Sequence, residues 1–259
     1  MAKETTKGLV NSLFEKVEGI ILKTQDYGET HKIVTLFTKE LGKVGAIARG
    51  AKKPKSRMAA ITQPFIYGSF LLQTGSGLGT IQQGEVQYSL RKIREDIIKT
   101  AYATYIAELT DKLLDPNQPD PYLFQQLFQT LQWMCDGKDP DVLTIIYELK
   151  MYKKAGFSPV VKHCVSCGNK DSDYSFSVNE GGLLCRKCKW KDETAVVLPI
   201  PIVKLLYVFS EINIERIGDI SIKKENKQLL QALMENYYDQ YGGYFLKSKK
   251  FLKQIDKFI

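Results

Sequence analysis

Four of the chain's five cysteines fall in one spacing, and that spacing restricts the fold more than any other feature of the sequence. Cys164 and Cys167 are separated by two residues, seventeen residues follow, and Cys185 and Cys188 repeat the first separation. Each Cys-x-x-Cys turn presents two thiolates, and two such turns form the tetrahedral sulfur cage that Zn²⁺ accepts. The pattern predicts one structural zinc ion per chain. Because protein sulfur fills all four ligand positions, the metal should hold a fold and perform no chemistry.

Two disulfides are the competing interpretation of the same cysteines, and they require an oxidising compartment. Residues 1–13 are polar with small side chains and lack the apolar core of a signal peptide. We expect them to be a flexible leader outside the fold of a cytoplasmic protein. No apolar run in the sequence approaches the ~18 residues of a membrane span, so we expect no contact with a membrane.

The formal net charge of +8 is unevenly distributed along the chain. Residues 41–84 contain no acidic side chain, and five cations fall within residues 49–57. Such a concentration of positive charge is typical of surfaces that bind nucleic-acid phosphates. A solvated loop that binds nothing is the alternative for so short a run. The residues predicted to bind DNA are Lys43, Arg49, Lys52, Lys53, Lys55 and Arg57.

A second group of lysines lies near the end of the sequence. At helical spacing, Lys247, Lys250 and Lys253 share one face of a helix. A solvated amphipathic helix explains this pattern adequately. A secondary DNA contact is the other interpretation, because the charges are clustered.

Short β-branched and aromatic runs separated by glycine turns dominate residues 14–88. They predict five strands that close into a small barrel, at about residues 17–22, 31–38, 43–48, 65–73 and 80–88. Three aromatic residues of this region, Tyr27, Phe65 and Tyr67, have two interpretations. They either stack on nucleic-acid bases or fill the core of the barrel.

The hydrophobic period changes to helical spacing over residues 89–259. We expect one helix at residues 92–114 and two more that begin at Asp120-Pro121 and Asp139-Pro140, because Asp caps the first amides and Pro fits the first turn. The cysteine segment interrupts this helical domain at about residues 161–192. The predicted fold class is therefore α+β: a five-stranded barrel packed on an all-helical domain with an inserted four-cysteine zinc module.

Motifs of nucleophilic hydrolases, zinc proteases and P-loop proteins do not occur in the sequence, and we do not expect an enzyme. A nucleic-acid-binding protein is the favoured class. In the alternative class, the zinc element and the basic segment dock acidic protein partners. A zinc-ribbon enzyme acting on nucleic acid is disfavoured, because no cluster of carboxylates accompanies the cysteines.

Several segments together resemble the bacterial RecO family of recombination mediators. The resemblance lies in Glu18-Gly19-Ile20-Ile21-Leu22, Asp26-Tyr27-Gly28-Glu29, the Arg-Gly-Ala-Lys-Lys-Pro-Lys-Ser-Arg segment at residues 49–57, Gln63-Pro64-Phe65, the four cysteines, and Leu246-Lys247-Ser248-Lys249-Lys250-Phe251-Leu252. It covers nearly everything after the leader. The complete set of cysteines is similar to the zinc-bearing branch of that family.

The resemblance implies a fold and a function that the residue spacing does not give. It implies an N-terminal OB-fold that binds single- and double-stranded DNA, with Arg49, Lys52, Lys53, Lys55 and Arg57 on phosphates. It implies strand annealing without nucleotide hydrolysis, in the cytoplasm at the nucleoid. The implied partners are RecR, the acidic C-terminal tail of single-stranded-DNA-binding protein and, indirectly, RecA, whose loading on coated strands the family assists.

Overall fold

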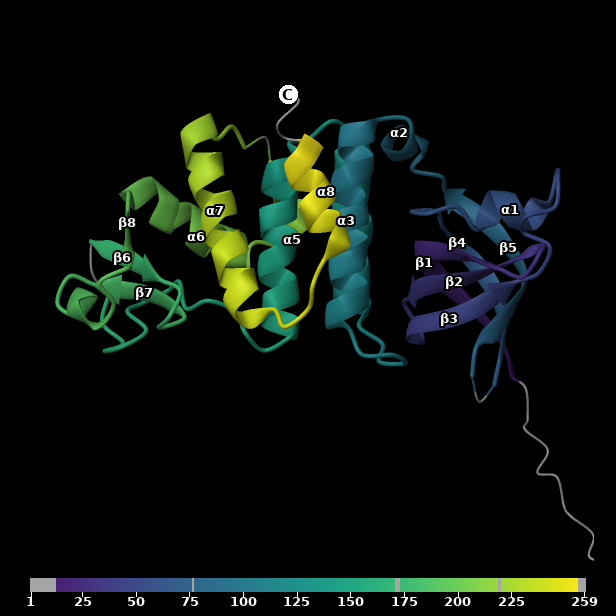
Figure 1. Cartoon of the computed structure of the whole chain (residues 1–259), viewed down its shortest axis with the longest axis horizontal. Helices are drawn as coiled ribbons and strands as arrows, with labels where there is room; N and C mark the ends of the chain where they lie inside the picture. Colours follow the sequence, from purple (N-terminus) through teal and green to yellow (C-terminus); the bar gives the residue numbers. More distant parts are fainter. Residues whose placement is uncertain (1–12, 76, 171–172, 219, 256–259) are drawn as a thin grey trace, which may run out of the picture. The chain divides into compact units, whose positions relative to one another are not determined.

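The computed structural model describes residues 13–75, 77–170, 173–218 and 220–255, which form two compact units. The first unit contains the described residues up to Leu90 together with Asp115–Phe124, and the second contains Arg91–Leu114 and the described residues from Gln125 onward (Figure 1). The α+β class is confirmed. The sequence assigned residues 115–124 to the helical domain, whereas the structure groups them with the strands.

Five strands of the first unit close into a barrel in the order β1-β2-β3-β5-β4. All neighbouring pairs are antiparallel except β3 with β5, which are parallel. This is the strand order of an OB-fold. The strands are β1 (Leu13–Tyr27), β2 (His31–Thr38), β3 (Gly42–Ala48), β4 (Tyr67–Thr74) and β5 (Gly79–Tyr88), with the short helix α1 (Arg57–Ile61) between β3 and β4.

The length of β1 allows it to close the barrel by itself. Its first half pairs with β4, from Leu13 opposite Thr74 onward, and its second half pairs with β2 as far as Tyr27 opposite His31. A register shift in the β2 pairing, between Ile21 and Lys23, is the irregularity that lets a strand bend sharply. The barrel encloses a core of aliphatic residues and one aromatic ring: Val17, Ile21, Val34, Leu36, Ala46, Ala48, Ala51, Ile66, Phe70, Leu72 and Ile81.

Residues 115–124 join the barrel at the start of β3. The backbone N–H of Asn117 donates to the carbonyl of Lys43 at 3.0 Å. Gly42 has a φ of +70°, and a Cβ placed there would lie 2.2 Å from the carbonyl oxygen of Gln118. Only glycine permits both that backbone conformation and that approach. The ring of Phe124 then packs edge-on against Phe37, with ring centroids 5.8 Å apart.

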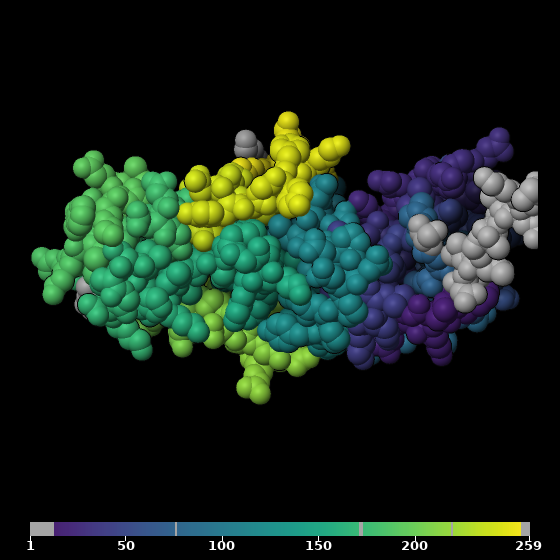
Figure 2. Space-filling model, turned by 90° about the horizontal axis from the view of Figure 1, so that it is seen from below, coloured from purple at the N-terminus to yellow at the C-terminus, as the bar shows by residue number. Residues whose placement is uncertain are grey.

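Helix α5 (Pro140–Lys154) is the centre of the second unit, because its residues 142–152 are all buried. It packs against α3, α6 and α7, and α8 packs against α3. Figure 2 shows the C-terminal segment, in yellow, lying directly on the teal helices. The other helices are α2 (Arg91–Arg94), α3 (Ile97–Leu113), α4 (Pro121–Cys135), α6 (Ile200–Glu211), α7 (Lys224–Tyr241) and α8 (Lys247–Ile255), with the 3₁₀ turns η1 (Lys189–Lys191) and η2 (Ile214–Arg216). In the described part of the chain, no helix has the length and apolar character to cross a membrane.

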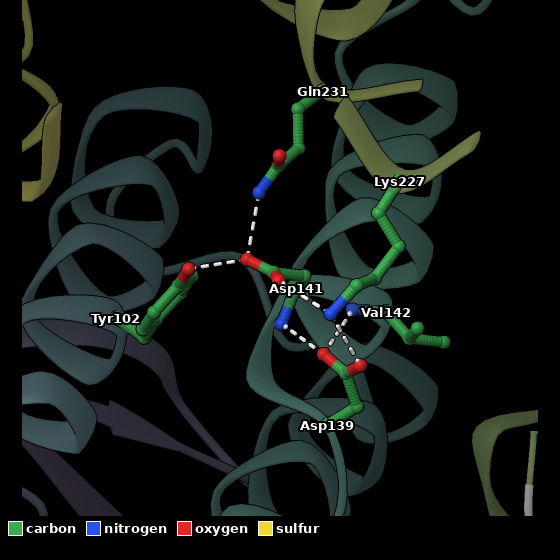
Figure 3. Close-up of polar contacts among 6 residues, drawn as sticks. All are labelled: Tyr102, Asp139, Asp141, Val142, Lys227 and Gln231. Carbon is green, nitrogen blue, oxygen red and sulfur yellow. Dashed lines mark hydrogen bonds and ion pairs between the residues drawn. The ribbon is translucent and has the colours of Figure 1, made fainter. Parts of the chain in front are cut away.

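The first turn of α5 joins three helices through two carboxylates (Figure 3). Asp139 caps α5 by accepting from the amide of Asp141 at 3.0 Å, as its Asp-Pro sequence predicts. Lys227 of α7 lies 2.8 Å from the Asp139 carboxylate and 3.0 Å from that of Asp141. Asp141 also accepts from the Tyr102 hydroxyl of α3 and from the Gln231 amide of α7. Burial lowers the pKa of Lys227, but the two hydrogen-bonded carboxylates outweigh it and leave the pKa raised.

The cysteines lie in a segment between α5 and α6 that we call the cysteine module (residues 161–198), which contains a small sheet. Its strands are β6 (Tyr174–Ser177), β7 (Gly182–Cys185) and β8 (Val196–Leu198), in the order β7-β6-β8. The turn between β6 and β7 reaches α7, where the Tyr241 hydroxyl donates to the carbonyl of Val178 at 2.7 Å. The module is therefore anchored to the helices of its own unit.

A buried acid lies inside the helical unit. The Tyr105 hydroxyl of α3 donates to Glu148 of α5 at 2.5 Å. Burial raises the pKa of Glu148 from 4.5 to about 7, although the Tyr105 hydrogen bond and the charge of Lys249 act in the opposite direction. The folded chain therefore holds a proton on Glu148 at pH values where the unfolded chain has released it. The stabilisation from that proton is complete below pH 4.5 and is lost as the pH rises through 7.

Replacing Glu148 with Gln should remove this pH dependence, because the amide keeps the shape and still accepts from Tyr105. Between pH 5 and pH 8 the free energy of unfolding of the parent should fall relative to the variant by about 2–3 kcal/mol. Urea unfolding at the two pH values measures the difference. Glu225→Gln, at an exposed position on α7, is the control and should behave as the parent does. Parallel pH profiles for the parent and Glu148→Gln would contradict the prediction.

Candidate nucleic-acid interface and metal centre

The cations at residues 49–57 form a loop, here called the basic loop, that leaves β3 and ends on α1. The β1–β2 hairpin holds its backbone: the amide of Gly50 donates to Nδ1 of His31 at 3.0 Å, and the amide of Lys52 donates to the carbonyl of Thr30 at 2.9 Å. Within the loop, the amide of Lys53 donates to the carbonyl of Gly50 at 3.1 Å. The contacts fix the path of the loop across the hairpin.

Four of the five cations of the basic loop are exposed and lack an ion-pair partner among the described residues. Arg49, Lys53, Lys55 and Arg57 are exposed, and none makes an ion pair with another residue in the described part of the chain. Lys52 differs, because its Nζ lies 2.8 Å from the Asp26 carboxylate of the hairpin. The hydrogen bond from Lys52 is the main cause of a lowered pKa at Asp26. Lys52 thus fastens the loop, and the other four cations face solvent.

Lys43 does not belong to this cluster of cations. It lies half-buried near the start of β3, whereas Arg49 follows the other end of that strand. Six residues of extended strand separate the two Cα atoms by about 20 Å. The sequence placed both residues on one DNA-binding surface because both fall in the acid-free stretch, and position in the sequence does not reveal which end of a strand a side chain occupies.

The two interpretations of the barrel aromatics are separated by burial. Phe65 is 3% exposed and Tyr67 is buried, with its hydroxyl donating to Glu18 at 2.9 Å. Both residues therefore belong to the interior. Tyr27 is 47% exposed at the tip of the β1–β2 hairpin. It follows Asp26 on β1, so it is the one of the three aromatic residues that is open to solvent on the hairpin that holds the basic loop.

Three hairpin residues that position the basic loop were not singled out from the sequence as part of a site. Asp26 falls in a segment that has ordinary turn composition. Thr30 contributes only its backbone carbonyl, and no side-chain pattern could have indicated it. His31 was the one available signal, because it is one of only two histidines in the chain and lies in a β-rich run.

The C-terminal lysines lie on α8 and differ from one another. Lys253 makes an ion pair with Glu235 of α7, and Lys249 lies 2.7 Å from the Asp239 carboxylate. Lys247 and Lys250 are exposed. The Glu108 carboxylate of α3 accepts from the amide of Ser248 at 2.8 Å and so caps the helix. Of the three lysines that the sequence placed on a secondary DNA contact, two remain open to solvent and one binds a neighbouring helix.

The four cysteine sulfurs converge within the cysteine module. All four lie within 4.8 Å of one another, and Sγ of Cys167 lies 3.7 Å from Sγ of Cys185. A tetrahedral zinc site with bonds of about 2.3 Å has sulfur atoms about 3.8 Å apart. Two turns hold the pairs, since the amide of Gly168 donates to the Cys164 carbonyl and that of Cys188 to the Cys185 carbonyl, each at 2.9 Å. The donor set and its spacing fit a zinc ion.

The electrostatics of the four thiols also fit a divalent cation. Burial raises the pKa of Cys164, but hydrogen bonds from the backbone of Cys185, Cys167 and Ser166 outweigh it and lower the pKa to about 6. The pKa of Cys185 is raised, by burial first and then by its contacts with neighbouring sulfurs. Ionisation of Cys164 is therefore favoured, whereas ionisation of Cys185 beside it is disfavoured. A bound Zn²⁺ supplies the positive charge that lets all four cysteines ionise.

Two family descriptions match the chain, one for each unit. The description "Recombination protein O N terminal" matches residues 13–90, and "Recombination protein O C terminal" matches residues 94–250. The chain is similar to the DNA repair protein RecO of Oceanobacillus iheyensis, with 56% identity over 247 residues that cover 95% of this chain and 96% of that protein. It is also similar to the DNA repair protein RecO of Bacillus cereus, with 48% identity over 246 residues that cover 95% of this chain and 99% of that protein.

The two family descriptions together cover the barrel, the basic loop and the cysteine module, and each relative matches 95% of this chain, so the likeness concerns the whole architecture and not one motif. At this identity and coverage, the chain belongs to the RecO family of DNA repair proteins.

Proposed function

We propose that this chain is a recombination mediator that binds single- and double-stranded DNA through the basic loop of its barrel. The observation that carries the proposal is the display of four exposed cations, without an ion pair to any described residue, on a loop that the hairpin holds in place. An OB-fold uses the loop between its first two strands, among others, to bind oligonucleotides. In this chain that loop is the hairpin on which the cations rest. A held array of cations neutralises phosphates without first having to become ordered.

Strand annealing follows from the same charge. Two complementary strands repel each other through their phosphates, and a strand covered by cationic protein repels its complement less. The proposed mechanism is charge neutralisation, in which Arg49, Lys53, Lys55 and Arg57 bind phosphates and Lys52 holds the loop. It requires no catalytic residue and no nucleotide hydrolysis.

The proposed partners follow from family membership. They are RecR, single-stranded-DNA-binding protein through its acidic C-terminal tail and, indirectly, RecA, which the chain would help to load on coated strands. The exposed Lys247 and Lys250 of α8 are suited to an acidic tail or to a secondary DNA contact. A cytoplasmic protein associated with the nucleoid is consistent with these partners.

The second candidate function is a protein-docking module, in which the basic loop binds acidic protein surfaces. The ion pair between Lys52 and Asp26 favours this candidate to a small extent, because it already joins the loop to a carboxylate. Salt dependence on DNA of unrelated sequences separates the candidates, since phosphate contacts release counterions and give a steep dependence.

The metal proposed for the cysteine module is one structural Zn²⁺, held by Cys164, Cys167, Cys185 and Cys188. A small sheet of three short strands has few residues with which to build a core. The free energy of metal binding is then the free energy that folds the module.

Neutralising three exposed cations of the basic loop should weaken DNA binding without unfolding the barrel. The variant Lys53→Gln/Lys55→Gln/Arg57→Gln should have a log–log salt slope on single strands that is shallower by about 2, because each phosphate contact contributes about 0.7. Its annealing rate should fall, and its thermal stability should stay near that of the parent, since exposed substitutions cost little. Fluorescence anisotropy with a labelled oligonucleotide measures the slope.

The matched control for the loop variant is Lys204→Gln/Lys223→Gln/Lys224→Gln, which removes the same charge from exposed positions of the helical unit. It should leave the slope close to that of the parent. If the two triple variants bind and anneal DNA alike, net charge and not the basic loop governs binding, and the assignment of the loop is wrong.

Metal content should depend on the clustered cysteines alone. The reduced, metal-replete chain should contain one zinc ion, and Cys185→Ser should lower the zinc content and the melting temperature of the chain, because the module loses a ligand. Cys135→Ser is the matched control, since Cys135 lies on α4 outside the cluster and should not affect zinc. Elemental analysis gives the stoichiometry. A zinc content well below one in the parent, or equal losses in both variants, would refute the site.

A further inference from the structure

The cysteine module presents an exposed aromatic ring among cations, at a surface here called the tryptophan patch (residues 186–191). Trp190 is 76% exposed on the 3₁₀ turn η1, directly after the last cysteine of the cluster. Successive side chains of a 3₁₀ helix project about 120° apart. Lys189 and Lys191 therefore lie on either side of the ring. Arg186 and Lys187 precede them and are also exposed.

The cations of the tryptophan patch are Arg186, Lys187, Lys189 and Lys191. The four cations make no ion pair with another residue in the part of the chain that the structure describes. The nearest acid in sequence, Asp192, is buried and accepts from the Ser177 hydroxyl and, at 2.9 Å, from the amide of Thr194. The Asp192 carboxylate is therefore engaged in hydrogen bonds inside the module and does not pair with the exposed cations.

The form of the tryptophan patch indicates what that ligand is. A ring that protrudes from the surface offers its faces, but it does not enclose an apolar side chain as the pocket of a peptide-binding site does. Flat partners stack on such a ring, and bases of single strands are flat, unpaired and attached to phosphates. Proteins that bind single strands combine cations for the backbone with aromatic rings for the bases. In double-stranded DNA the base faces are covered by their neighbours.

We propose that the tryptophan patch is a second contact site for single-stranded DNA, in which a base stacks on Trp190 and the flanking cations bind phosphates. This inference rests on the proposed DNA-binding function and extends it to the other unit of the chain. The zinc-held turn then positions a nucleic-acid contact in addition to holding its own fold. The basic loop would bind strands of both kinds, and the tryptophan patch would add a preference for unpaired bases.

Tryptophan fluorescence tests the stacking directly, because the chain has only two tryptophans. The zinc-loaded full chain carrying Trp133→Phe leaves Trp190 as the single emitter. Titration with an oligothymidine strand should quench its emission. An abasic oligonucleotide of equal length, which has phosphates without bases, should quench it little. Trp190→Ala should weaken binding of oligothymidine roughly 5- to 100-fold, Trp190→Phe should restore most of the affinity, and binding to a blunt duplex should change little.

Further measurements keep the outcome unambiguous. Zinc content and thermal stability of each variant establish that the module is folded. Lys189→Gln/Lys191→Gln should reduce the single-strand salt slope by about 1.4. If the parent binds DNA but Trp190 is neither quenched nor needed, the inference is overturned and the proposed function stands. If the parent binds no DNA, the proposed function itself fails. Quenching by a polyglutamate peptide and not by oligothymidine would assign the patch to acidic proteins and overturn the inference.

Discussion

Closure of the barrel by β1 is the constraint on which the DNA-binding assignment depends. One strand pairs with β4 along its first half and with β2 along its second half, so the β1–β2 hairpin has a fixed position in a closed structure. The end of β3 pairs with the start of β2, and the loop that follows β3 therefore leaves beside that hairpin. His31, Thr30 and Asp26 can then bind the loop.

The two units are stabilised by different means. The barrel encloses an apolar core, whereas the helical unit adds buried polar groups whose partners come from several helices. The carboxylates of Asp139 and Asp141 together bind groups of α3, α5 and α7, and removal of either one would leave partly buried donors without that acceptor. The cysteine module brings together four sulfurs that would repel one another once ionised. A metal ion is the natural solution to that repulsion.

Much of the fold could be predicted from the sequence, because the signals involved were local. The alternating runs indicated five strands, and Asp-Pro pairs marked the first turns of α4 and α5. The cysteine spacing predicted sulfurs that do converge. What could not be predicted depends on pairings distant in the sequence. Lys43 falls in the same acid-free stretch as Arg49 but lies at the other end of β3, and residues 115–124 join the barrel through a backbone contact at Gly42. Trp190 follows Cys188 after one intervening residue and belongs to no sequence motif. Only its exposure in the structure indicates a role.

The central claim is that DNA contacts the barrel at the loop that the hairpin holds. Hydrogen–deuterium exchange of the full chain, with and without a single-stranded oligonucleotide, tests it most directly because it reports where along the backbone the strand binds. The account predicts slower exchange in peptides that cover residues 49–57, in the adjoining hairpin and in residues 186–191, with little change in the buried helix α5. Slower exchange confined to the helices of the second unit, with the basic loop unchanged, would contradict it.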